Sequence, residues 1–368
     1  MRRLSPEAVA LRSAGHPWFT VAAWIVAVVV AVGLSSNILG DVLTTDARLT
    51  NNPESERAAT LIEEHLGVKE GFTEVLIVSS PDLTVDDPAF EAHVRSVATA
   101  AREVAEPSPR GVVTFYDVGD PGMVSDDRHT TLVPVTFAYA ERNDQYLPHI
   151  EALVEQAGTG SFEAHTFGRI SMEHELSGIS EEDLRKGESI GVLVALIVLL
   201  SVFGTVVASL LPIALALASI GAALGLVALV GLAFELSFFI TNILTMMGLA
   251  VGVDYSLFIV SRYREERGRG LDKHAAIGVA GATAGRAVVF SGITVMLALA
   301  GMLLLPNTIF RSLGTGAMLV VFATIVASLT LLPALLSLLG DRIDALRVGR
   351  RNRGEAAEGR FWDRVARR

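Results

Sequence analysis

Long apolar runs, interrupted by one large polar segment, dominate the chain. Each run is apolar over roughly 18 residues or more, close to the ~20 residues that a helix needs to cross the hydrocarbon core. The runs are Trp18–Ile38, Ser189–Val206, Leu210–Leu232, Phe238–Val260, Ala287–Leu305 and Leu313–Leu339. Pro212, near the short break between the second and third runs, is consistent with a tight connection. We predict a multi-span α-helical membrane protein with six transmembrane helices.

The first run could be mistaken for a secretory signal peptide, because Arg2, Arg3 and Arg12 precede it. Its apolar part is longer than the roughly 7–15 residues of a signal peptide, and no clear cleavage motif follows it. We therefore predict that this run is an uncleaved first span.

The polar segment 39–187 alternates between helical and strand patterns. The helical patterns are Pro53–Leu66, Asp87–Glu106 and Gln145–Gln156, and Glu173–Lys186 is predicted to run as a helix into the second span. The strand patterns are Thr73–Val78, Gly111–Val118, Thr130–Tyr139 and Phe162–Phe167. This alternation predicts an α+β domain of modest size.

The distribution of charge predicts the orientation. The segment 39–187 carries 28 acidic and 11 basic residues. The connection 261–286 carries 3 acidic and 6 basic residues, and the tail 341–368 carries 5 acidic and 9 basic residues. Short basic loops stay in the cytoplasm. We predict four parts in a bacterial cytoplasmic membrane: a cytoplasmic N-terminus with the first span (1–38), an extracytoplasmic α+β domain (39–187), a five-helix bundle (188–340) and a basic cytoplasmic tail (341–368). In the connection, Leu271–Ala284 is predicted to form a small amphipathic helix along the membrane surface.

Asp254 is the most informative residue of the sequence. It lies inside the fourth run, where an aspartate costs roughly 2.5–3.5 kcal/mol on insertion scales. Such residues are usually retained for a proton relay, an ion path or a paired charge. Glu188 and Glu235 lie only at the edges of spans. Because a carboxylate facing lipid is costly, we expect Asp254 to be enclosed by a partner helix, where its protonated form is favoured.

Small and hydroxyl-bearing residues accompany Asp254. Gly248 and Gly252 form a G-x-x-x-G pair that lets another helix approach closely. Tyr255 follows Asp254 directly and is a candidate partner in a proton relay. Ser291 and Thr294 in the fifth run are possible relay hydroxyls, but either could equally bond its own helix backbone.

Several stretches of the chain resemble the MMPL family of the RND transporter superfamily. They are GLAVGVDYSLF at 248–258, SRYREE at 261–266, AGRAVVFSG at 284–292 and LLPALL at 331–336. The resemblance implies one half of an RND-type transporter with an α+β porter-like domain, and assigns Asp254 and Tyr255 to half of the proton relay. It also implies export of lipids or other hydrophobic compounds driven by the proton-motive force, with membrane lipids, a hydrophobic substrate, protons and a second transporter half as partners.

Members of this family usually carry two such halves, so the sequence is expected to be a truncated N-terminal half or else a half-size subunit with a partner chain. Two other functions stay open: a SecD/SecF-like half-size subunit that assists protein translocation, and a non-transporting lipid sensor. The sequence offers no catalytic constellation, no metal-ligand spacing among its 8 histidines, no cysteine and no sign of nucleic-acid binding. We therefore predict a secondary active transporter without a cofactor, not an enzyme.

Overall fold

The computed structural model describes residues 5–44, 49–51, 53–66, 71–103, 109–138 and 143–347. It divides the chain into two compact units. The first combines Met1–Asn51 with Lys186–Arg368, and the second is Asn52–Arg185. Three expectations from the sequence stay predictions. They are the domain division at residues 39 and 187, the side of the membrane on which each part lies, and the cytoplasmic location of both termini. The predicted tail 341–368 falls outside the described residues beyond position 347.

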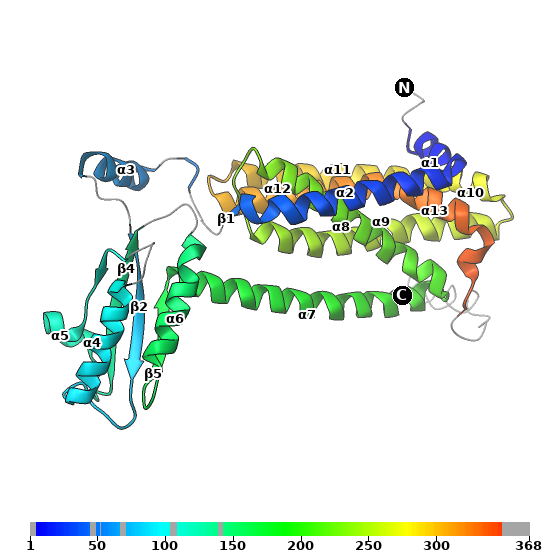
Figure 1. The fold of residues 1–368 in the computed structure, drawn as a ribbon. Coiled ribbons are helices and arrows are strands. Elements are labelled where there is room, and N and C mark those ends of the chain that lie inside the picture. Colours follow the sequence, from blue (N-terminus) through cyan, green and yellow to red (C-terminus); the bar gives the residue numbers. More distant parts are fainter. Residues whose placement is uncertain are drawn as a thin grey trace, which may run out of the picture. The chain divides into compact units, whose positions relative to one another are not determined.

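The first unit is helical (Figure 1). Its helices are α1 (Pro6–Gly15), α2 (Pro17–Val42), the end of α7 (Arg169–Phe203), α8 (Val206–Gly231), α9 (Phe239–Gly268), α10 (Lys273–Ala280), α11 (Arg286–Ala300), α12 (Thr308–Leu329) and α13 (Leu331–Leu339). Two short parallel strands, β1 (Leu43–Thr44) and β6 (Leu236–Ser237), pair at one end of the bundle.

In the described residues, five helical stretches are long and apolar enough to cross a membrane. They are Pro17–Gly40, Val206–Gly231, Phe239–Gly268, Lys273–Leu304 and Thr308–Asp344. The second predicted span corresponds to a shorter apolar stretch, Ser189–Phe203, which is the last part of α7. The helix ends there because Gly204 takes a left-handed backbone with φ +66°. A total of six spans therefore stays a prediction.

The boundary between the second and third predicted spans differs from the expectation. The helix α8 begins at Val206, and Pro212 lies inside it, not in a connection between helices. Neighbouring helices can compensate for the hydrogen bond that a proline removes from a membrane helix. The tight turn comes instead from Gly204, eight residues before Pro212.

The helix α8 is the centre of the bundle. It packs against α2, α9 and α12, and about half of its residues are buried. Gly225 permits the closest contact with α2, because a Cβ placed on it would lie 2.6 Å from the Cα of Ala31. A second small residue of α8, Gly221, faces Val28 of α2. The pair therefore acts in helix packing, as small residues at this spacing commonly do.

Five buried serine and threonine hydroxyls of the bundle bond to the backbone of their own helices. In each case the hydroxyl donates to the carbonyl four residues earlier, at 2.6–2.8 Å. The residues are Ser209 and Ser219 in α8, Ser256 in α9, and Ser312 and Thr324 in α12. These polar groups thus satisfy themselves locally in an apolar interior.

The connection between α9 and α11 is helical for most of its length. The helix α10 continues through a π-helical turn, Gly281–Gly285, into α11 without a break. The predicted small helix over Leu271–Ala284 corresponds to α10 and this π-helical turn, and its place along the membrane surface stays a prediction. Ala276, Ile277 and Ala280 form the buried side of α10 and pack in the core shared with α1.

The second unit contains a four-stranded antiparallel sheet with strand order β3-β4-β2-β5. The strands are β2 (Gly71–Ser79), β3 (Gly111–Val112), β4 (Thr130–Ala138) and β5 (Glu163–Gly168), and the helices are α3 (Glu54–Leu66), α4 (Pro88–Glu103), α5 (Phe115–Val118), α6 (Leu147–Ala157) and the start of α7. Leu76 pairs with Val133 and with Thr166 in the register of the sheet. Alternate residues of β2 and β4 are buried, and they form one core with apolar residues of α4 and α6. The predicted α+β pattern is therefore present in this unit.

One predicted strand of the second unit ends as a short helix. The segment 111–118 forms only the two-residue strand β3, and Phe115–Val118 is the short helix α5. Thr114 and Asp117 form a capping box at its start, in which the Asp117 side chain accepts a hydrogen bond from the Thr114 N–H. The hydroxyl of Thr114, and secondarily its backbone N–H, lower the pKa of Asp117. This local bonding outweighs the β-branched and aromatic composition of the segment.

Glu74 is a buried carboxylate that holds the start of α7. It lies on β2, is 1% exposed, and accepts hydrogen bonds from the Ile170 backbone N–H and the Ser171 hydroxyl, both at 2.7 Å. Gly168 must lack a side chain, because a Cβ there would collide with the carboxylate. The first turn of a helix carries unpaired N–H groups and a partial positive charge, so the carboxylate stabilises this helix end.

We expect Glu74→Gln to loosen the junction between the sheet and α7. The amide replaces one acceptor oxygen by a donor, and a hydrogen bond to a charged group contributes about 1.5–3 kcal/mol. Amide hydrogen exchange on the full chain should therefore become roughly tenfold faster, or more, in β2 and the first turn of α7. Glu163→Gln, an exposed change at the start of β5, is the matched control and should leave these rates unchanged. Equal rates in both variants would contradict the assigned role of Glu74.

Candidate functional site

Asp254 lies near the middle of α9, 15 residues after Phe239. Among the described residues of the five candidate spans, the other acidic side chains lie in end turns, as Glu265 and Glu266 do at the end of α9. The side chain of Asp254 is exposed. Met246 and Phe258, eight residues before it and four after it, are 63% and 64% exposed. These three residues share one open face of α9, because residues four apart lie on the same side of a helix.

The exposure of Asp254 differs from the expected enclosure by a partner helix. The helices α8, α10 and α12 pack against α9, and the buried residues of α9 face them. In the described residues, none of the recorded hydrogen bonds or ion pairs involves the Asp254 carboxylate. An enclosed carboxylate would therefore need a further helix on this open face.

Tyr255 points away from this face into the bundle. It is 7% exposed and belongs to the core that includes Ile259, Val288 and Ile325. Its hydroxyl lies beside Gly292 of α11, where an added Cβ would be 3.4 Å from it. Adjacent helical positions point about 100° apart, which explains why one residue of the pair is buried and the other exposed. The structure brings Tyr255 to α11 and leaves Asp254 outside that contact.

Gly248 and Gly252 lie where α9 contacts its neighbours. A Cβ on Gly252 would lie 2.7 Å from the Cβ and 2.8 Å from the Cα of Ala216 on α8. A Cβ on Gly248 would collide with Ile220 of α8 and lie 2.9 Å from Val320 of α12. The two glycines therefore set the distance between α9 and α8 in the turns just before Asp254.

Ser291 and Thr294 are both exposed on α11. The hydroxyl of Thr294 donates to the carbonyl of Phe290 at 2.9 Å, within its own helix. Ser291 immediately precedes Gly292, the residue that the Tyr255 hydroxyl approaches. The assignment of either hydroxyl to a relay stays a prediction.

Ion pairs surround the end of α9 that is predicted to be cytoplasmic. Arg262 pairs with Glu266 at 2.6 Å, and Arg269 pairs with Glu265 at 2.6 Å. Arg264 pairs with Asp344 at 2.7 Å and donates to the carbonyl of Phe203 at the end of α7. The pairs of Arg262 and Arg269 lie within this end of α9, and the contacts of Arg264 join α9 to the end of α7 and to Asp344.

The start of α10 is fixed by Asp272. Its carboxylate accepts hydrogen bonds from the backbone N–H groups of Ala275 and His274, at 3.0 and 2.8 Å, which lower the pKa of Asp272. Lys273 donates to the carbonyl of Ser337 at 2.8 Å, which joins α10 to α13. Within the described ranges, no group of three or more His, Cys, Asp or Glu residues is arranged to hold a metal ion.

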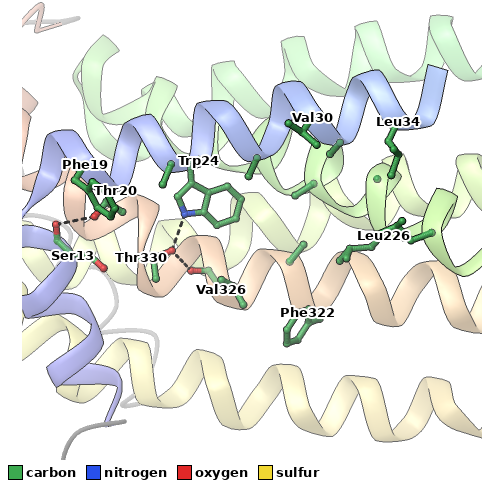
Figure 2. Close-up of a pocket in the computed structure, with 17 residues that line it drawn as sticks. Ser13, Phe19, Thr20, Trp24, Val30, Leu34, Leu226, Phe322, Val326 and Thr330 are labelled. Carbon is green, nitrogen blue, oxygen red and sulfur yellow. Dashed lines mark hydrogen bonds between the residues drawn. The ribbon is translucent and has the colours of Figure 1, made fainter. Parts of the chain in front are cut away.

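A groove along α2 is the feature that sequence reasoning missed. This α2 groove has a volume of about 710 Å³ and lies between α2, α8 and α12 (Figure 2). Its walls are Ser13, Phe19, Thr20, Ala23, Trp24, Ala27, Val30, Ala31, Leu34, Ala222, Gly225, Leu226, Leu229, Phe322, Ala323, Val326 and Thr330. Ala23, Ala27 and Ala31 recur every four residues, and this line of small side chains was the signal available in the sequence.

Comparison with known proteins places this chain in a family. The sequence model of the MMPL family matches residues 49–368, which is most of the chain. The chain belongs to the MMPL family. It is accordingly a multi-pass membrane protein with several apolar helices, and the resemblance noted from the sequence is confirmed.

Individual MMPL relatives match over nearly the whole chain. A membrane protein of Streptomyces coelicolor, SCO6666, is 34% identical over 363 residues, covering 96% of this chain and 48% of that protein. The mycolic acid-containing lipids exporter MmpL11 of Mycolicibacterium smegmatis is 29% identical, covering 94% of this chain and 36% of its own length. The trehalose monomycolate exporter MmpL3 of the same organism is also 29% identical, covering 88% of this chain and 33% of its own length. This chain therefore spans between one third and about half of these relatives.

Proposed function

We propose that this MMPL chain forms one half of a transporter that exports lipids or other hydrophobic compounds, driven by the proton-motive force. In this proposal Asp254 binds and releases the proton, Tyr255 takes part in the same relay, and Gly248 and Gly252 hold α9 against α8. A second transporter half would cover the open face of α9. The observation that carries the proposal is the position of Asp254, an acidic side chain near the middle of a membrane-length helix.

The comparisons support the class of cargo. MMPL proteins are transporters, and the two mycobacterial relatives are named as exporters of mycolic acid-containing lipids and of trehalose monomycolate. The proposal names the class of cargo and not a particular lipid.

The energy available from protons is sufficient for export. One proton that moves inward across 100 mV releases about 2.3 kcal/mol. Since about 1.4 kcal/mol corresponds to a factor of ten in an equilibrium constant, one proton supports roughly a 40-fold concentration ratio of substrate. A carboxylate that changes protonation would also change its interaction with the surrounding helices, which links proton movement to conformation.

We expect transport by the complete protein to stop when the proton gradient is removed. The complete transporter would be reconstituted in liposomes, and transfer of a fluorescent long-chain lipid would be followed with and without an imposed pH gradient. Transfer should require the gradient and should disappear on addition of a protonophore. Liposomes without protein give the background. Transfer at the same rate without a gradient would exclude proton coupling, and lipid binding without any transfer would favour a lipid sensor.

A further inference from the structure

The α2 groove has apolar walls and one polar end. Figure 2 places Ser13, Thr20, Trp24 and Thr330 at that end and Leu34 and Leu226 toward the other. The walls come from α2, α8 and α12, together with Ser13 of α1 and Thr330 after α12, all within the first unit. The volume of about 710 Å³ lies within the range of roughly 300–1,000 Å³ that is typical of small-molecule sites.

The side chains of Trp24, Thr330 and Thr20 at the end of the groove already have hydrogen-bond partners within the protein. The indole Nε1 of Trp24 donates to the Thr330 hydroxyl at 2.9 Å, and that hydroxyl donates to the carbonyl of Val326 at 2.6 Å. The hydroxyl of Thr20 donates to the carbonyl of His16 at 3.1 Å. A ligand in the groove therefore meets mainly hydrocarbon, which selects an apolar chain and not a polar solute.

Thr330 can take this position because the helix is interrupted there. It lies between α12 and α13, with φ −121°. Pro333 has no N–H to bond a carbonyl four residues earlier, so the helical bonding cannot continue unchanged through this point. The interruption places the Thr330 hydroxyl toward α2, where it fixes the Trp24 ring as part of the wall.

The groove begins at the level expected for lipid headgroups. Trp18 and Phe19, in the first turn of α2, are 75% and 78% exposed, and tryptophan is enriched at the membrane–water interface. Arg12 and His16 are exposed just before this turn. From Phe19 to Leu34 the helix rises about 22 Å, at about 1.5 Å per residue. One leaflet contributes about 15 Å of hydrocarbon, half of a core of about 30 Å, so the groove can hold one extended lipid chain.

We propose that the α2 groove is a binding site for one acyl chain of a membrane lipid. The chain lies along Ala23 and Ala27, with its terminal methyl toward Leu34. The lipid head lies beside Arg12 and His16 at the junction of α1 and α2. With the predicted orientation, this lipid comes from the cytoplasmic leaflet. The site is separate from Asp254 and does not depend on proton coupling, so binding can be measured without transport.

Photolabelling of the purified full chain in nanodiscs tests this site. The probe is palmitic acid with a diazirine near its terminal methyl, and labelled peptides are identified by mass spectrometry. We expect saturable labelling of α2, α8 and α12 that unlabelled palmitate displaces. Ala27→Trp fills the groove with an indole, and a clash of about 1.4 kcal/mol or more lowers affinity at least roughly tenfold. Labelling of these helices should fall by about that factor.

Val26→Trp is the matched control, because Val26 precedes Ala27 on the same helix but is 61% exposed and outside the groove. The photolabelling of α2, α8 and α12 in this variant should equal that of the unchanged chain. Ala23→Phe provides a second groove-filling variant if Ala27→Trp does not fold, and it should reduce labelling in the same helices. Labelling spread evenly over lipid-facing residues such as Val198 of α7 and Leu297 of α11, or undiminished in a folded groove-filling variant, would overturn the proposal.

Discussion

Asp254→Asn is expected to reduce proton-driven transport by the complete protein to the background rate. Asparagine has nearly the same size and can form hydrogen bonds, but it cannot take up or release a proton near physiological pH. The free energy of about 2.3 kcal/mol per proton per 100 mV is then no longer coupled to transport. The measurement is gradient-driven transfer of a fluorescent lipid in liposomes, normalised to the amount of folded protein.

The matched control for Asp254→Asn is Glu265→Gln, which makes the same chemical change on the same helix. Glu265 lies near the end of α9, where it pairs with Arg262 and Arg269. This variant should retain most transport, because surface ion pairs contribute little stability. Folding is checked by thermal denaturation of both variants. Full transport by a folded Asp254→Asn protein would remove Asp254 from the proposed relay.

Gly252→Ala is expected to destabilise the helix bundle. The new methyl group would lie 2.7–2.8 Å from the Cβ and Cα of Ala216, and a backbone atom cannot move aside as a flexible side chain can. Overpacking of this kind costs about 1–3 kcal/mol. The helices α8 and α9 would have to separate next to Asp254, so transport should fall as well. The melting temperature of the detergent-solubilised chain measures the first effect.

Gly33→Ala distinguishes this clash from a general effect of replacing glycine in a membrane helix. A Cβ on Gly33 of α2 meets nothing within 4 Å. Alanine has a higher helix propensity than glycine by about 1 kcal/mol, so this variant should be as stable as the unchanged chain or more stable. If Gly252→Ala melts no lower than Gly33→Ala, the close approach of α8 and α9 at Gly252 is wrong.

Hydrophobic periodicity predicted most elements of the fold, because burial and membrane length dominate this chain. The predicted helix Pro53–Leu66 corresponds to α3 and the predicted strand Thr130–Tyr139 to β4, each to within one residue at either end. The continuity of α10 with α11 was not predicted, for a tertiary reason. Gly281 lies against Ala10 of α1, and this packing adds α10 to the core.

The candidate site was predictable in its residues but not in its geometry. A lone acidic residue in an apolar run identifies Asp254 from sequence alone. Whether it faces a neighbour depends on which sides of α9 are covered, and the sequence of one helix does not contain that information. The α2 groove and the Glu74 contact with α7 were missed for the same reason, since Trp24 and Thr330 are 306 positions apart and Glu74 and Ile170 are 96 apart.

The buried hydroxyl groups of the bundle restrict how a proton can travel. A proton wire needs side chains that pass hydrogen bonds from one to the next, but Ser209, Ser219, Ser256, Ser312 and Thr324 each donate to their own helix. In the proposed transporter these five hydroxyls cannot conduct without first breaking those bonds. In the proposal, Tyr255 and water along the open face of α9 remain as conductors, so proton access to Asp254 depends on whatever admits or expels that water.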